Sequence, residues 1–96
     1  MLKTDIHPEA RAAIDAIIKS MLHAYKLRGY TVRVGDDEGG DEAIFIDINY
    51  EMNDLPFDTS INAKLVSAVS DLLLKYRDDR FPYIYHRFQD GQKITS

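Results

Sequence analysis

The stretch EAIFIDINYE, residues 42–51, has isoleucine at three successive alternate positions, 44, 46 and 48. Successive side chains of an extended chain point to opposite sides. One side of this segment carries Ile44, Ile46, Ile48 and Tyr50, and the other carries Phe45, Asp47, Asn49 and Glu51. The pattern predicts a sheet strand with one face against a core and the other toward water.

Two amphipathic helices are expected to cover the apolar side. The first is predicted over residues 8–28, with Pro8 at its first position and Gly29 after its end. Its apolar stripe consists of Ile14, Ile17, Ile18, Met21, Leu22 and Tyr25. The second begins near Asp58, Thr59 or Ser60, which are capping residues. Its apolar stripe consists of Ile61, Leu65, Ala68, Val69, Leu72 and Tyr76.

The remaining segments predict two further strands. Tyr30, Val32 and Val34 alternate with polar residues, and the loop GDDEGGDE joins this strand to the next in a hairpin. Pro82 prevents the second helix from continuing, so FPYIYHRF, residues 81–88, is expected to run extended. Asp90 and Gly91 are expected to form a turn before a short return strand or a frayed end.

These elements predict an α+β fold in the order α-β-β-α-β. We expect a two-layer sandwich, with both amphipathic helices packed on one face of a small antiparallel sheet. At 96 residues the chain is long enough for one core, so residues 1–96 are expected to form a single domain. About 1–7 and 90–96 are expected to fray.

Composition narrows the classes of function. The chain has no cysteine, which excludes a disulfide framework, a thiolate metal site and a cysteine nucleophile. Charged side chains interrupt the N-terminal segment, and no long apolar run is present. We therefore expect a cytoplasmic protein with no membrane partner, and no motif indicates a cofactor.

The charge is unevenly distributed. Residues 34–63 contain nine acidic and no basic side chains, whereas residues 1–33 and 64–96 each contain six basic ones. An acidic block of this length repels the phosphate backbone, so nucleic acid is not the expected partner.

Asp47, Asn49 and Glu51 are the candidates for a metal site, because their oxygens suit Ca²⁺ or Mg²⁺. Alternate residues of a strand lie about 6.5 to 7 Å apart and project in parallel, whereas ligand oxygens converge on one point. The row is therefore more typical of the solvent-exposed face of a sheet.

Partner binding is expected at two places. The acidic loop contains Asp36, Asp37, Glu38, Asp41 and Glu42, which favour a basic partner or form a solvated tip. Phe45, Tyr83, Tyr85 and Arg87 are residue types enriched in protein contacts. The segment 83–88 is also explained by core or edge-strand packing, and its aromatic side chains suit base stacking.

No arrangement of residues indicates catalysis: the three histidines are far apart, and no serine lies in a nucleophile elbow. We therefore expect a small non-enzymatic protein-interaction module of the adaptor, inhibitor or immunity kind, acting as a homodimer and using an acidic docking surface. The alternatives are a metal-dependent enzyme or metal-binding domain using Asp47, Asn49 and Glu51, and a single-stranded nucleic-acid binder using the C-terminal aromatic segment.

Overall fold

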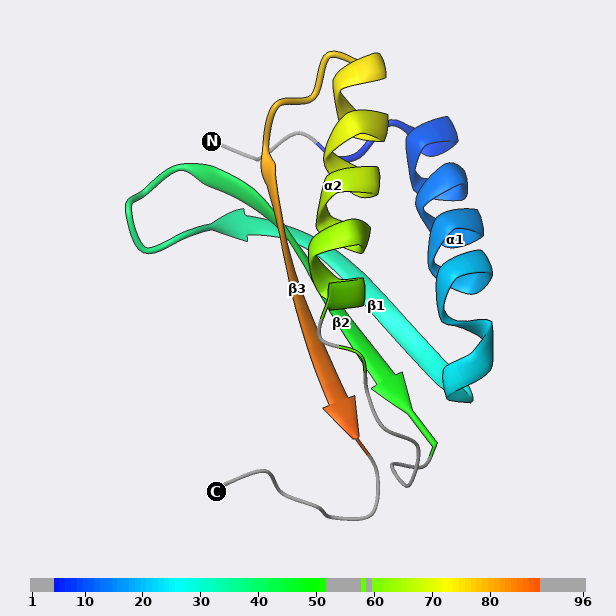
Figure 1. Cartoon of the computed structure of the whole chain (residues 1–96). Coiled ribbons are helices and arrows are strands. Elements are labelled where there is room, and N and C mark those ends of the chain that lie inside the picture. Colours follow the sequence, from blue (N-terminus) through cyan, green and yellow to red (C-terminus); the bar gives the residue numbers. More distant parts are fainter. Residues whose placement is uncertain (1–4, 52–57, 59, 89–96) are drawn as a thin grey trace.

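The described residues form two α-helices and three strands (Figure 1). A computed structural model describes residues 5–51, 58 and 60–88, and the turn predicted at Asp90 and Gly91 lies outside them. The elements are α1 (Pro8–Leu22), the 3-10 turn η1 (His23–Tyr25), β1 (Leu27–Asp36), β2 (Glu42–Tyr50), α2 (Ser60–Lys75) and β3 (Phe81–Phe88). The predicted order α-β-β-α-β is therefore confirmed. Within the described ranges, neither helix has the length and apolar character needed to cross a bilayer.

The sheet has the strand order β1-β2-β3 and is mixed. β1 and β2 form the predicted antiparallel hairpin, but β3 runs parallel to β2, so the expectation of an antiparallel sheet is wrong. The reason is the connection through α2, whose 16 residues span about 24 Å and return the chain to the end of the sheet where β2 begins. β3 then starts beside the start of β2, with Phe81 opposite Ala43.

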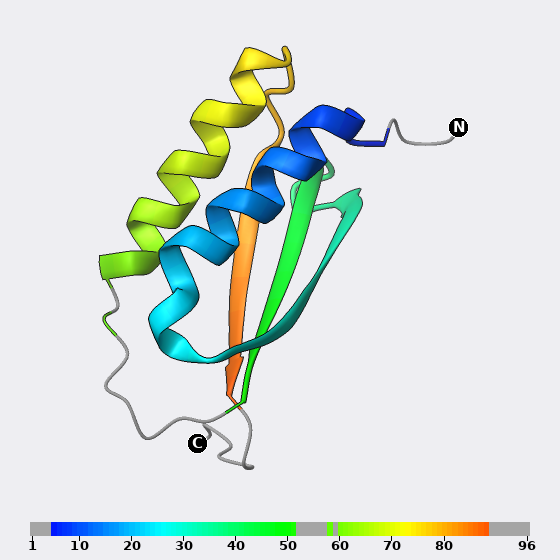
Figure 2. The same ribbon diagram turned by 90° about the vertical axis from the view of Figure 1, so that its right-hand side faces the viewer.

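Both helices lie on the same side of the sheet (Figure 2). The core between the helices and the sheet is apolar, and it joins both helices to the central strand, β2. Its buried members are Ile6, Ala10, Ile14, Ile18, Leu22, Ile44, Ile46, Ile48, Tyr50, Leu65, Val69 and Leu73. The Tyr30 hydroxyl donates a hydrogen bond to the Asp15 carboxylate and so ties the edge strand β1 to α1.

The first helix ends earlier than its sequence indicated. The α-helix stops at Leu22, η1 follows, and Lys26 takes a left-handed conformation with φ 52°. Gly29, expected just beyond the helix, instead lies inside β1, where the pairing register with β2 shifts between Leu27 and Gly29. The left-handed residue ends the helix, and the glycine lies at a bulge, which is a position that glycine often takes in strands.

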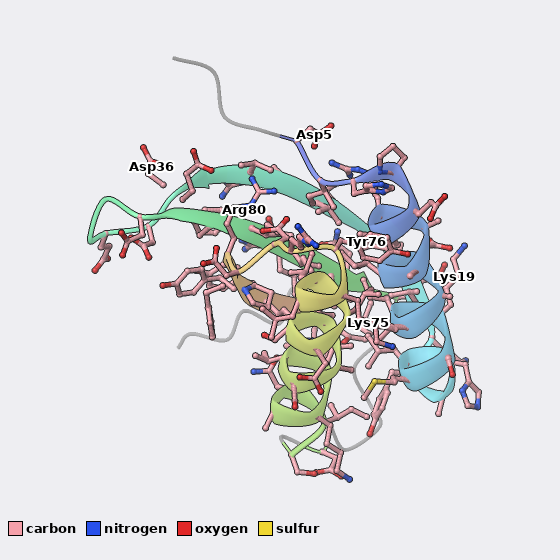
Figure 3. The ribbon with its side chains drawn as sticks, turned by 90° about the horizontal axis from the view of Figure 1, so that it is seen from above. Asp5, Lys19, Asp36, Lys75, Tyr76 and Arg80 are labelled. Atoms are coloured by element: carbon pink, nitrogen blue, oxygen red, sulfur yellow. The ribbon has the colours of Figure 1, made fainter. Side chains whose placement is uncertain are left out.

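The end of α2 turns the chain back toward the sheet. Arg77 has φ 61°, and the backbone N–H groups of Arg77 and Asp78 donate to the carbonyls of Leu74 and Leu73. These two bonds form a Schellman motif, with arginine at the position that glycine usually occupies. Arg80 then pairs with Asp78, Nη2 to Oδ2 2.7 Å, where the connection reaches the sheet (Figure 3).

Candidate partner-binding site

The sheet surface opposite the helices is called here the open face. Every second residue of each strand points into the core, and the residues between them lie on the open face. The pairing registers align them in rows across the three strands: Arg33, Phe45 and Tyr83 in one row, Thr31, Asp47 and Tyr85 in the next. The open face therefore combines aromatic rings with charged groups.

The tip of the β1–β2 hairpin curves away from the helices, toward the side of the open face (Figure 1). Viewed from above, Asp36 lies on this hairpin, far from both helices (Figure 3). A pocket of about 520 Å³ is lined by residues of the hairpin and of the two neighbouring strands: Asp36, Asp37, Glu38, Gly39, Phe45, Tyr83 and Tyr85. We call it the acidic–aromatic pocket. Its volume is within the range of ligand pockets.

Asp37 fixes the shape of the hairpin tip. Its Oδ1 accepts hydrogen bonds from the backbone N–H groups of Gly39 (2.9 Å) and Asp41 (3.0 Å). Its Oδ2 accepts one from the Tyr83 hydroxyl (3.1 Å), which joins the tip to β3. These hydrogen bonds hold the pKa of Asp37 below its ordinary value. The bond from the Asp41 N–H has the largest effect, and the bond from the Tyr83 hydroxyl has a smaller one. Asp37 is therefore a carboxylate at neutral pH.

Three aromatic rings lie close together at the pocket end of the open face. The rings of Phe45 and Tyr83 are stacked, with centroids 5.4 Å apart and planes 17° apart. Phe81 meets Tyr83 edge-on at 4.8 Å. Phe81 and Tyr85 are 50% and 45% exposed, so much of this aromatic area faces solvent. Exposed aromatic surface of this kind is a common component of protein contacts.

The other residues predicted to bind a partner lie outside this pocket. Asp41 and Glu42 line a second hollow with Asp79, Arg80 and Phe81, and Arg80 lies 3.6 Å from a Glu42 carboxylate oxygen. Arg87 lies farther along β3, where its Nη2 is 3.0 Å from Asp47 Oδ1. The predicted residues thus divide into six that share the acidic–aromatic pocket and three that do not.

The row of metal candidates is not gathered around one point. Asp47 is ion-paired with Arg87, and Glu51 follows the end of β2, with its backbone N–H bonded to the Lys26 carbonyl. In the part of the chain that the structure describes, no three His, Asp or Glu side chains are grouped so as to hold a metal ion.

A polar chain of hydrogen bonds lies on the covered side of the sheet. His86 Nδ1 is 2.7 Å from the Tyr50 hydroxyl, and its Nε2 is 2.8 Å from Asn62 Oδ1. Because Asn62 Oδ1 accepts, His86 carries its proton on Nε2 and accepts from Tyr50 at Nδ1. Burial lowers the pKa of His86 and raises that of Tyr50, so both groups stay neutral near pH 7. The network joins β2, α2 and β3.

Two residues of the open face were missed by the sequence reasoning. The Arg33 guanidinium carbon lies 4.5 Å from the centroid of the Phe45 ring. Gly35 leaves room for that ring, because a Cβ at residue 35 would lie 3.2 Å from Phe45 Cε2. The hairpin register was the signal for both: once Ala43 is placed opposite Gly35, Arg33 falls opposite Phe45.

Comparison of this chain with protein-family models, with curated proteins and with solved structures found no match.

Proposed function

We propose that the protein is a small non-enzymatic interaction module that binds a basic segment of another protein at the acidic–aromatic pocket. The observation that carries the proposal is the composition of that pocket. Three carboxylates of the hairpin, at residues 36–38, line one hollow with Phe45 of β2 and with Tyr83 and Tyr85 of β3, which are more than 40 residues farther along the sequence. Carboxylates attract a cationic segment, and aromatic rings supply the contact area that anchors it.

The architecture supports this proposal. In a two-layer arrangement the helices bury one side of the sheet, so the open face is available for a partner. The charges also support it, because the acidic block of residues 34–63 includes every carboxylate that lines the pocket. Complementary charge speeds association and excludes acidic competitors.

Single-stranded nucleic acid is a weaker candidate for the same face. The Tyr83 hydroxyl is bonded to the Asp37 carboxylate, and Arg87 is paired with Asp47. Tyr83 and Arg87, which would meet a base and a phosphate, therefore each lie beside a negative charge, and this charge repels the nucleic-acid backbone.

The test compares two variants that lose the same charge. Asp36→Asn with Glu38→Gln removes two carboxylates from the pocket, and Glu9→Gln with Asp71→Asn removes two from exposed positions on the helices. The probe is a fluorescent peptide of alternating arginine and glycine, followed by anisotropy at low salt. We expect the pocket variant to bind about fivefold more weakly than wild type, since each exposed ion pair contributes about 0.2–1 kcal/mol, and the helix variant to bind like wild type.

Absence of saturable binding at low salt, or an equal loss in both variants, would overturn the proposal. An oligonucleotide serves as the second probe, and tighter binding of the oligonucleotide than of the peptide would favour the nucleic-acid alternative instead. The homodimer expected from the sequence stays a separate prediction, which sedimentation over a wide concentration range tests.

A further inference from the structure

The open face already holds one guanidinium group against an aromatic ring. Arg33 on β1 lies over the ring of Phe45 on β2, at 4.5 Å, and Tyr83 on β3 stacks against the same ring. Because β2 is the central strand, Arg33 and Tyr83 approach Phe45 from opposite sides. The three side chains form a stack across the sheet, with a cation at the β1 end and an aromatic ring at the β3 end.

The β3 end of that stack opens into the acidic–aromatic pocket. Tyr83 and Tyr85 both line it, and Tyr85 is 45% exposed. The Asp37 carboxylate at the hairpin tip is ionised at neutral pH, as its lowered pKa requires, and Asp36 and Glu38 line the same hollow. The pocket therefore places ring surfaces and negative charge within reach of one incoming cation.

We propose that the acidic–aromatic pocket binds an arginine side chain of the partner protein. The guanidinium of this arginine extends the stack of Arg33, Phe45 and Tyr83 and is the second guanidinium in it. This inference rests on the proposed function and names the residue that the pocket recognises. A guanidinium is planar, so it lies flat on a tyrosine ring while its N–H groups reach a carboxylate in pairs. The ammonium of lysine is compact and more strongly hydrated, so it gains less from the same rings.

The experiment is an NMR titration of the intact chain with three short capped peptides that differ at one position. The peptides are Gly-Arg-Gly, Gly-Lys-Gly and the citrulline form, which keeps the shape of arginine but is uncharged. We expect the arginine peptide to shift the signals of the hairpin tip and of Tyr83 and Tyr85, with an affinity about threefold or more above that of the lysine peptide, and the citrulline peptide to leave them unchanged.

A pair of variants tests the ring contact. Tyr85→Ala removes an exposed ring from the pocket, and Leu74→Ala removes a side chain of comparable exposure, 59%, from α2. We expect Tyr85→Ala to weaken arginine-peptide binding by about threefold or more and Leu74→Ala to leave it unchanged. Retention of the wild-type amide spectrum outside the pocket verifies that each variant is folded.

The outcomes separate this inference from the proposed function. Equal binding of the arginine and lysine peptides, or no effect of Tyr85→Ala, would overturn the arginine assignment while the basic-partner function stands. Failure of both charged peptides, together with failure of the longer basic probe, would remove the proposed function itself. Signal shifts confined to residues outside the pocket would also overturn the assignment.

Discussion

The two faces of the same sheet have different chemistry, although they are built from alternate residues of the same strands. Ile44, Ile46 and Ile48 are fully buried beneath the helices. The residues that alternate with these isoleucines in β2 lie on the open face and are only partly buried: Phe45, Asp47 and Asn49. Apolar burial, and with it the folding free energy, is concentrated on one face, so the other face is free for the binding proposed above.

The polar groups of the two faces also differ in burial. On the covered face, His86 is neutral and its ring nitrogens are both hydrogen-bonded to side chains of other elements. On the open face its neighbour Arg87 is charged and 63% exposed in an ion pair with Asp47. Buried polar groups need partners to avoid a loss of stability, whereas an exposed ion pair contributes little.

The largest expected effect compares how much two neighbouring residues of β2, one on each face, contribute to the free energy of unfolding. Ile46→Ala should lower the free energy of unfolding by about 3 kcal/mol, because it opens a cavity in the core. Phe45→Ala should lower it by about 1 kcal/mol, since only part of that ring is removed from water. Urea denaturation of both variants, with an unchanged slope, measures the difference. Equal losses would show that the open face also holds the fold together.

A middle-sized effect concerns the buried histidine. The folded-state pKa of His86 lies below 6.5, so the unfolded chain binds a proton more readily than the folded chain as the pH falls. The stability that results from keeping His86 neutral is present above about pH 6.5 and is lost as the pH falls through the folded-state pKa.

His86→Phe should remove this pH dependence and, at pH 8, cost about 1–2 kcal/mol, because the Tyr50 hydroxyl loses the acceptor that His86 provides. Unfolding curves recorded from pH 5 to 8 for wild type and variant measure both effects, with the folded-state pKa taken from the histidine ring signals. An unchanged slope in His86→Phe would assign the pH dependence to other groups and weaken the contrast between the faces.

The smallest expected effect belongs to the open face. The pair of Arg87 and Asp47 should contribute less than about 0.5 kcal/mol to stability, because Arg87 is largely exposed. A double-mutant cycle with Arg87→Gln and Asp47→Asn isolates the coupling. A coupling above about 1 kcal/mol would mean that ion pairs on the open face stabilise the fold, contrary to the division drawn above.

Local patterns in the sequence predicted the elements and the β1–β2 hairpin, but they did not predict how β3 pairs. The alternation in residues 42–51 correctly placed the isoleucines in the core, and Pro82 correctly marked the chain as extended there. The parallel direction of β3 was missed, although a helix between two adjacent strands generally makes them parallel. The sequence did not indicate that β3 would lie beside β2 rather than beside β1.

The candidate site shows the same limit. Asp37 and Tyr83 were each predicted to bind a partner, but nothing local joined them. They meet because parallel pairing places Tyr83 opposite Phe45, while the hairpin tip curves onto the same face. Arg33 was missed because its role depends on lying opposite Phe45, and that register comes from the hairpin as a whole.

The sequence by itself determined which side chains share a face, because the two-residue period of a strand and the 3.6-residue period of a helix are local properties of the backbone. It also determined the acidic character of the hairpin tip. Only the tertiary structure decided that this tip and the tyrosines of β3 would form one pocket. Strand order and direction depend on which pairing buries the apolar stripes of both helices at once, and that is a property of the whole chain.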